Sequence, residues 1–101
     1  MKTEIIKIKI VKPEKEKIQL AAQLLKQGEI VAFPTETVYG LGARLTEIMA
    51  IKKIFKAKKR PADNPLIVHV TDIAKVADIA EITPLARKLM QKFWPGPLTL
   101  L

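Results

Sequence analysis

The spacing of apolar residues changes repeatedly along this chain, and that change limits the possible folds more than any other feature of the sequence. Between residues 3 and 11, isoleucine alternates with lysine, which is the two-residue period of a half-buried strand. Between residues 14 and 27, apolar side chains recur at helical intervals and form one stripe of an amphipathic helix. Strand patterns that alternate with helix patterns predict an α/β fold, in which helices pack on a twisted mixed sheet.

Proline, glycine and capping residues mark the ends of the predicted elements. Gly28 is placed to end the first helix in the left-handed conformation, Thr46 can cap the second helix, and Pro84 suits the first turn of the last one. Either Thr71 or Asp72 can cap the short helix between them. The predicted strands are residues 3–11, 30–33, 66–70 and 98–101, and the predicted helices are residues 14–27, 46–57, 71–80 and 84–93.

The sequence stops inside the apolar run LTLL. A strand at a chain terminus usually ends in a few polar residues. We therefore expect residues 1–101 to be the N-terminal portion of a single domain that is truncated at its C-terminal end.

The composition excludes several classes of protein. The chain has no cysteine, so it forms neither disulfides nor thiolate metal sites, and a reducing cytoplasm is the expected location. No apolar run approaches the roughly 20 residues that are needed to span a bilayer. The N-terminal residues alternate in polarity and lack the continuous apolar core of a signal peptide. We expect a cytoplasmic protein without a membrane partner.

Positive charge is concentrated in one segment of the chain. The formal net charge is +8, and the segment from Arg44 to Arg60 contains seven basic residues and one acidic residue, Glu47. Such a local excess favours a polyanionic partner, either the phosphates of a nucleotide or an RNA backbone. A lysine-rich face that is simply solvated gives the same pattern, so charge alone does not choose between the two interpretations.

The stretch FPTETVYGLGA contains more polar side chains than a plain turn requires. Thr35 and Thr37 follow a buried strand, at the edge where open α/β sheets bind ligands. Gly40 and Gly42 would let the backbone turn sharply and let a ligand approach. The glycine spacing matches neither a dinucleotide fingerprint nor a P-loop. The alternative is a capped turn, in which the hydroxyls bond to nearby amides.

A second candidate site is the loop KKRPADNP, which two prolines stiffen. Lys58 and Arg60 lie two residues apart in it and suit a polyphosphate, since arginine binds as a fork and lysine as a point charge. Asn64 can both donate and accept a hydrogen bond there. The alternative is a solvated basic loop in which Asn64 starts a turn before Pro65.

His69 is the one histidine of the sequence and lies within the predicted strand LIVHV. A lone histidine without cysteine or clustered carboxylates is weak evidence for a metal ligand, so no metal site is predicted. No Ser/His/Asp array and no carboxylate pair can be assembled from the sequence. Any chemistry here would therefore work by positioning and by stabilisation of charge.

Three motifs, FPTETVYGLGA, AKKRPADNPLIVHV and WPGPLTLL, together resemble those of the YrdC-like threonylcarbamoyl-AMP synthases, from about Ile18 to Leu101. The resemblance implies a twisted α/β domain with a large, positively charged concave surface. It also implies a nucleotidyltransferase, which forms threonylcarbamoyl-AMP and pyrophosphate from L-threonine, bicarbonate and ATP. The product serves the threonylcarbamoyl-adenosine modification of tRNA.

The resemblance implies a role for each candidate residue on the amino-acid side. Thr37, the second threonine of PTET, would contact the substrate L-threonine, with Thr35 beside it. His69 would hold the same substrate.

On the nucleotide side, Lys58 and Arg60 would meet the phosphates of ATP and act as the catalytic cations. Asn64 would also contact ATP. Magnesium is implied with ATP, although no ligands for it are identified here. A threonylcarbamoyl-transferase complex is implied as a later partner.

The family also has a later Ser-x-Asn motif, and some members have a second domain, neither of which is found in this sequence. We therefore expect these residues to hold about half of a site. One alternative is a basic module that binds double-stranded RNA or tRNA without catalysis. Another is the related domain of hydrogenase-maturation carbamoyltransferases, but those contain cysteine-rich zinc motifs that this sequence lacks.

Overall fold

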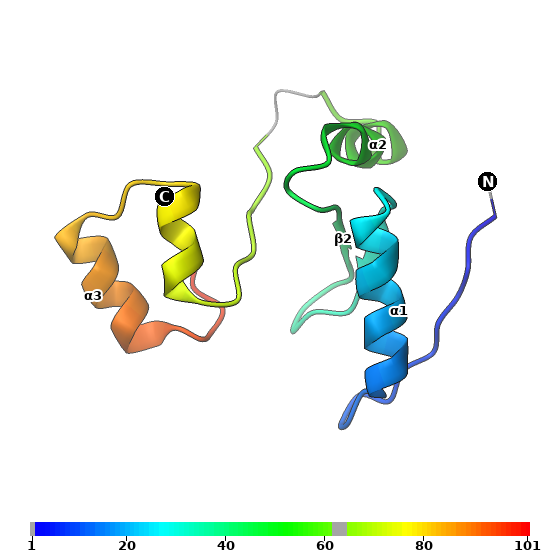
Figure 1. The fold of residues 1–101 in the computed structure, drawn as a ribbon, viewed down its shortest axis with the longest axis horizontal. Coiled ribbons are helices and arrows are strands. Elements are labelled where there is room, and N and C mark those ends of the chain that lie inside the picture. Colours follow the sequence, from blue (N-terminus) through cyan, green and yellow to red (C-terminus); the bar gives the residue numbers. More distant parts are fainter. Residues whose placement is uncertain (1, 62–64) are drawn as a thin grey trace. The chain divides into compact units, whose positions relative to one another are not determined.

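The computed structural model describes residues 2–61 and 65–101. The chain divides into two compact units, Met1–Asn64 and Pro65–Leu101. Figure 1 shows the elements of each unit. Within the described residues, no helix is both long and apolar enough to cross a bilayer.

The first unit is built around a small β-hairpin. Strands β1 and β2 are antiparallel, with Ala32 opposite Leu41 at the centre of the pair. Helix α1 contacts β1 and helix α2 contacts β2, so the helices pack on the sheet as the α/β prediction requires (Figure 1). The elements are α1 (Lys15–Lys26), β1 (Val31–Phe33), β2 (Gly40–Gly42) and α2 (Ile48–Lys58).

Helix α1 ends where the sequence predicted. Gly28 has a φ of +84° and occupies the left-handed position after the helix. The Gly28 N–H donates to the Leu25 carbonyl at 3.1 Å, and the Glu29 N–H donates to the Leu24 carbonyl at 3.0 Å. These two bonds form a Schellman motif, which satisfies carbonyls at the helix end. The predicted role of Gly28 is confirmed.

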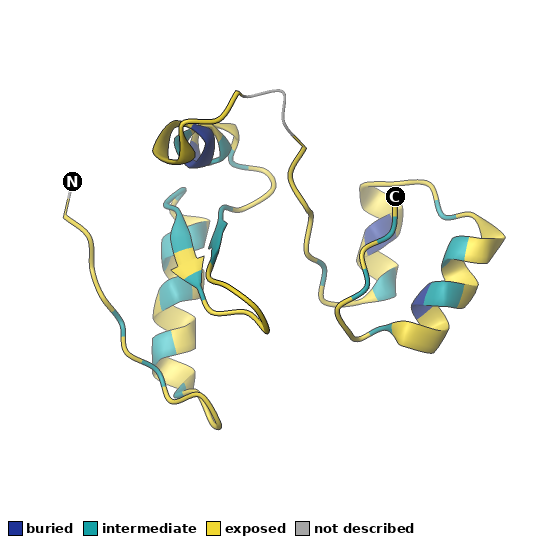
Figure 2. Cartoon of the chain, turned by 180° about the vertical axis from the view of Figure 1, so that it is seen from behind, coloured by how far each residue is buried: buried dark blue, intermediate teal, exposed yellow. Residues whose placement is uncertain are grey.

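Helix α2 provides the buried core of the first unit. Ala50, Ile54 and Phe55 are buried on it, and Figure 2 shows these positions in dark blue. The helix begins at Ile48, and the residue before it makes no side-chain capping bond. The prediction that Thr46 caps this helix is therefore wrong.

The second unit contains one 3₁₀ helix, η1 (Ile73–Asp78), and one α-helix, α3 (Pro84–Phe93). The Asp72 carboxylate accepts a hydrogen bond from the Lys75 N–H at 3.2 Å and so caps η1. Thr83 caps α3, and Pro84 is its first residue, as predicted. The buried residues described in this unit are Val76 and Met90.

The turn after α3 is held by a tryptophan. The Trp94 indole N–H donates to the Leu98 carbonyl at 2.9 Å, and the Leu98 N–H donates to the Gly96 carbonyl at 2.9 Å. The predicted end of the helix before the WPGP sequence is confirmed.

Three predicted strands, residues 3–11, 66–70 and 98–101, are not strands in the structure. A strand needs a neighbour that pairs with its backbone N–H and C=O groups. In the part of the chain that the structure describes, β1 pairs only with β2, and none of these three segments joins the sheet. Within the described residues, the sheet is therefore a two-stranded antiparallel one rather than the larger mixed sheet that the pattern predicted.

The N-terminal segment is tied instead to the start of α1. The Lys9 N–H donates to Glu14 Oε2 at 3.3 Å, and Lys17 Nζ donates to the Lys7 carbonyl at 2.5 Å. Lys17 Nζ also lies 3.8 Å from Glu14 Oε1. Hydrogen bonding from its own backbone N–H, then from Lys9, and the charge of Lys17 outweigh desolvation and lower the pKa of the Glu14 carboxyl.

Candidate functional site

The loop from Pro34 to Tyr39 joins the two strands of the hairpin and is exposed throughout. The Thr35 hydroxyl accepts a hydrogen bond from the Thr37 N–H at 3.3 Å and donates one to the Val38 carbonyl. The hydroxyl oxygens of Thr35 and Thr37 lie 3.5 Å apart. The structure thus brings the two predicted threonines together. The Thr35 side chain stabilises the loop through hydrogen bonds to the loop's own backbone.

The two glycines after this loop do not form a turn. Gly40 and Gly42 lie in β2 and have no positive φ, so the predicted sharp turn is wrong. The Phe33 ring covers them instead. A Cβ atom on Gly40 would lie 3.0 Å from Phe33 Cζ, and one on Gly42 would lie 2.7 Å from Phe33 Cε1. The glycines leave room for this ring, a role that sequence reasoning missed.

Lys58 and Arg60 lie on either side of a left-handed residue. Helix α2 ends at Lys58, and Lys59 follows it with φ 54° and ψ 43°. The Arg60 N–H donates to the Phe55 carbonyl at 3.0 Å and closes the helix end. The left-handed residue and this hydrogen bond together fix the backbone between the two predicted cations. From the sequence, only the two prolines are expected to stiffen this loop. Glycine is the residue that usually marks a left-handed position after a helix, but this position holds lysine, so the sequence does not reveal the conformation.

Most cations of the predicted basic segment are exposed, and most of these lie in or just after the C-terminal part of α2. Lys53 is an exception, since its Nζ lies 3.7 Å from Glu29 Oε2 and it is half-buried. Positive side chains near a helix C-terminus also interact favourably with the helix dipole. The exposed cations in and just after α2 are Lys52, Lys56, Lys58, Lys59 and Arg60, and Arg44 is exposed before the helix.

The remaining predicted residues are placed differently. His69 belongs to the second unit and is exposed, in the segment before η1. Asn64 lies outside the described residues, so its predicted role stays a prediction. Of the predicted site residues, the structure therefore groups Thr35 with Thr37, and Lys58 with Arg60.

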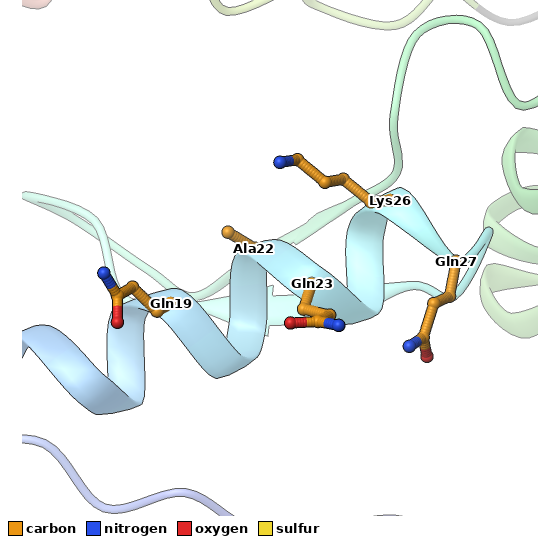
Figure 3. Close-up of a pocket in the computed structure, with 5 residues that line it drawn as sticks. All are labelled: Gln19, Ala22, Gln23, Lys26 and Gln27. Atoms are coloured by element: carbon orange, nitrogen blue, oxygen red, sulfur yellow. The ribbon is translucent and has the colours of Figure 1, made fainter.

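The described residues offer no ready metal site, because no three His, Cys, Asp or Glu side chains gather in that part of the chain. A shallow depression on the surface of α1 contains none of the predicted site residues (Figure 3). Amide side chains dominate it, and they provide neither a nucleophile nor a proton-transfer group at neutral pH. Its lining residues are Gln19, Ala22, Gln23, Lys26 and Gln27.

Comparison with known proteins gives consistent matches. Over 85 residues, the chain is 56% identical to a threonylcarbamoyl-AMP synthase of Bacillus subtilis, covering 83% of this chain and 25% of the relative. It is 53% identical over 88 residues to the synthase of Pyrococcus abyssi, covering 86% of this chain and 26% of that relative. The chain thus spans about a quarter of the length of these relatives.

A solved structure agrees with these matches. The crystal structure of P. abyssi Sua5 complexed with L-threonine is similar to 84% of this chain, which corresponds to 25% of that protein. The TM-score is 0.79 and the sequence identity is 50%. The family model for Sua5, YciO and YrdC proteins, described as telomere recombination, matches residues 23–101. The chain therefore belongs to the Sua5/YciO/YrdC family.

Proposed function

We propose that this chain provides part of the active site of a threonylcarbamoyl-AMP synthase in the cytoplasm. The observation that supports this most strongly is the 56% identity to a relative with that name, over 83% of the chain. In the proposed reaction, L-threonine, bicarbonate and ATP give threonylcarbamoyl-AMP, pyrophosphate and water. The product would be passed to a threonylcarbamoyl transferase that modifies tRNA.

The hairpin loop is the proposed amino-acid side of the site. Thr37 is exposed there, so its hydroxyl is available for a hydrogen bond to L-threonine. The Thr35 hydroxyl already bridges two backbone groups of the loop, so its main contribution would be to hold Thr37 in place. The P. abyssi Sua5 crystal with L-threonine supports this choice of ligand. His69, from the second unit, is proposed as a further contact.

Lys58 and Arg60 form the proposed nucleotide side. Both side chains are exposed, and the left-handed Lys59 fixes the backbone between them. An arginine fork and a lysine point charge together suit adjacent phosphates. Asn64 is proposed as an additional contact to ATP.

The reaction requires one anion to approach another. The amino group of threonine and bicarbonate first form a carbamate and release water. A carbamate oxygen then bonds to the α-phosphorus of ATP while the bond to the leaving pyrophosphate breaks. Cations at Lys58 and Arg60 would lower the repulsion and stabilise the charge that develops on pyrophosphate. Magnesium is proposed to enter bound to the phosphates of ATP.

A chimera tests this proposal, because the chain spans only a quarter of its relatives. In the chimera, this chain replaces the region of the B. subtilis synthase that it matches. We expect threonylcarbamoyl-AMP, detected by mass, to form only when threonine, bicarbonate and ATP are all present. A folded chimera that releases pyrophosphate independently of threonine would contradict the proposal.

Isothermal titration of the 101-residue chain itself tests how much of the site it holds. We expect L-threonine and ATP to bind the chain more weakly than they bind the chimera, because about half of the contacts would be missing. Binding of equal strength would contradict the half-site hypothesis.

RNA binding is the second candidate function, and the exposed cations of α2 favour it. A phosphate-binding surface of this kind predicts affinity for double-stranded RNA or tRNA that falls steeply with salt and does not depend on threonine. A filter-binding titration at several salt concentrations tests it. Binding that does not weaken with salt would exclude the basic surface as the contact.

A further inference from the structure

The Phe33 ring lies at the base of the hairpin loop. Phe33 is directly opposite Gly40 in the register, and Val31 is opposite Gly42. Residues that face each other in an antiparallel pair, and residues two apart on one strand, share a face of the sheet. The ring therefore extends over both glycines on one face. An aromatic ring that covers a cross-strand glycine is a known way to stabilise an otherwise weak strand pair.

The fit between ring and glycines leaves no room for a larger residue. The ring atom nearest to a Cβ on Gly42 would be Cε1, at 2.7 Å, whereas Cδ1 would lie at 3.6 Å, an ordinary contact. On Gly40 the nearest ring atom would be Cζ, at 3.0 Å. The close contacts thus come from the outer half of the ring. A shorter side chain at position 33 would remove them.

We propose that Phe33 is a positioning residue for the amino-acid side of the site. Its ring, seated on Gly40 and Gly42, holds the two ends of the Pro34–Tyr39 loop together, so that Thr37 is presented in one arrangement. The inference rests on the proposed function, since it assigns the loop to L-threonine. The glycines then serve the ring, and they do not serve a close approach by the ligand.

NMR on the 101-residue chain tests whether the Phe33 ring packs on Gly40 and Gly42. We expect the Phe33 ring current to displace the α-proton resonances of Gly40 and Gly42, and Phe33→Leu to abolish that displacement. We also expect Phe33→Leu to increase the fast backbone motion of the loop. If neither the resonances nor the motion changed in a folded Phe33→Leu chain, the inference would be overturned.

The consequence for the substrate is tested in the chimera. Gly42→Ala would push the ring away and raise the KM for threonine about tenfold, while the KM for ATP changes less than about twofold, because the misplacement is confined to one side of the site. Gly40→Ala, with the looser contact, would have a smaller effect in the same direction. Ala32→Val is the matched control, since Ala32 is exposed on the other face of β1, and we expect it to change neither KM.

A double variant separates this inference from direct contact between the glycines and the ligand. In Phe33→Leu with Gly42→Ala, the shorter side chain leaves room for the new methyl group. We expect the double variant to have the same KM for threonine as Phe33→Leu alone, because the methyl group no longer meets a ring. If the double variant is as impaired as the two single effects combined, Gly42 faces the ligand and the inference is wrong.

Failure of the proposed function would look different. A chimera that never forms threonylcarbamoyl-AMP contradicts the synthase proposal, whereas the NMR measurements on the chain still decide whether Phe33 orders the loop. If Gly42→Ala raised the KM for threonine and the KM for ATP equally, Phe33 would have only a general structural role. That result would overturn the positioning claim and leave the proposed function standing.

Discussion

The hydroxyl of Thr35 accepts a hydrogen bond from the backbone N–H of Thr37, at a distance of 3.3 Å. The same hydroxyl donates to the Val38 carbonyl. One side chain therefore satisfies a donor and an acceptor of the loop backbone. The loop that the sequence suggested as a ligand site is also a capped turn, so the two interpretations of its hydroxyls are compatible.

Removal of the Thr35 hydroxyl should loosen the loop. Thr35→Val keeps the shape of the side chain but loses both hydrogen bonds, and we expect amide hydrogen exchange at Thr37 to become about tenfold faster, in line with the net worth of such bonds. Thr35→Ser is the matched control, because it keeps the hydroxyl and should keep the exchange rate. Equal rates in the Val and Ser variants would contradict the bonding described here.

Replacement of Lys59 by glycine should stabilise the chain. Lys59 has a φ of 54°, where a Cβ atom is strained and glycine is not, so Lys59→Gly should raise the free energy of unfolding by about 1 kcal/mol. Lys56→Gly is the control, since Lys56 lies inside α2 and the same change there should lower it by about 1 kcal/mol. Urea denaturation measures both, and a loss of stability in Lys59→Gly would argue against the left-handed conformation.

The N-terminal segment should detach from α1 in acid. Folding lowers the pKa of Glu14, so the ionised carboxylate favours the folded contact. This contribution is fully present above the ordinary carboxyl pKa of the unfolded chain and is lost as the pH falls through the lower folded value. We expect the Lys9 amide resonance to report this transition, and Glu14→Gln to remove it. An unchanged pH profile in Glu14→Gln would assign the transition to another group.

The two proposed cations should act on ATP rather than on threonine. In the chimera, Lys58→Ala and Arg60→Ala should each raise the KM for ATP about tenfold, because a hydrogen bond assisted by charge is lost, and each should lower kcat, because the charge on the leaving pyrophosphate is less stabilised. Lys52→Ala removes an exposed charge from the same helix and should have little effect. If Lys52→Ala were equally damaging, the surface would act through its overall field and not through two specific contacts.

The features predicted correctly from sequence are those with local causes. The Asp72 cap of η1, the proline at the start of α3 and the glycine at the end of α1 act within a few residues, and the structure has all of them. By contrast, Gly-Leu-Gly has no alternation of polarity, and glycine is typical of turns, so β2 was missed. Only the register with Phe33 shows why glycine is required there.

The predicted strands at residues 3–11 and 66–70 show the opposite problem. The alternation in the first segment and the apolar run in the second both fit a strand, but pairing depends on a neighbour that local sequence does not identify. The candidate site also has features that local sequence predicts and features that it does not. The residue types in PTET and KKRP indicated the chemistry, whereas the left-handed Lys59 and the internal bonds of Thr35 depend on backbone geometry.

The most direct test of the account is the KM for L-threonine of the Thr37→Ala chimera. We expect an increase of about tenfold, with the KM for ATP nearly unchanged, because one substrate hydrogen bond is lost on the amino-acid side. Thr46→Ala is the control, since Thr46 is exposed and makes no capping bond to α2. A KM for threonine that is the same in Thr37→Ala as in the parent chimera would contradict the assignment of this loop to the amino acid.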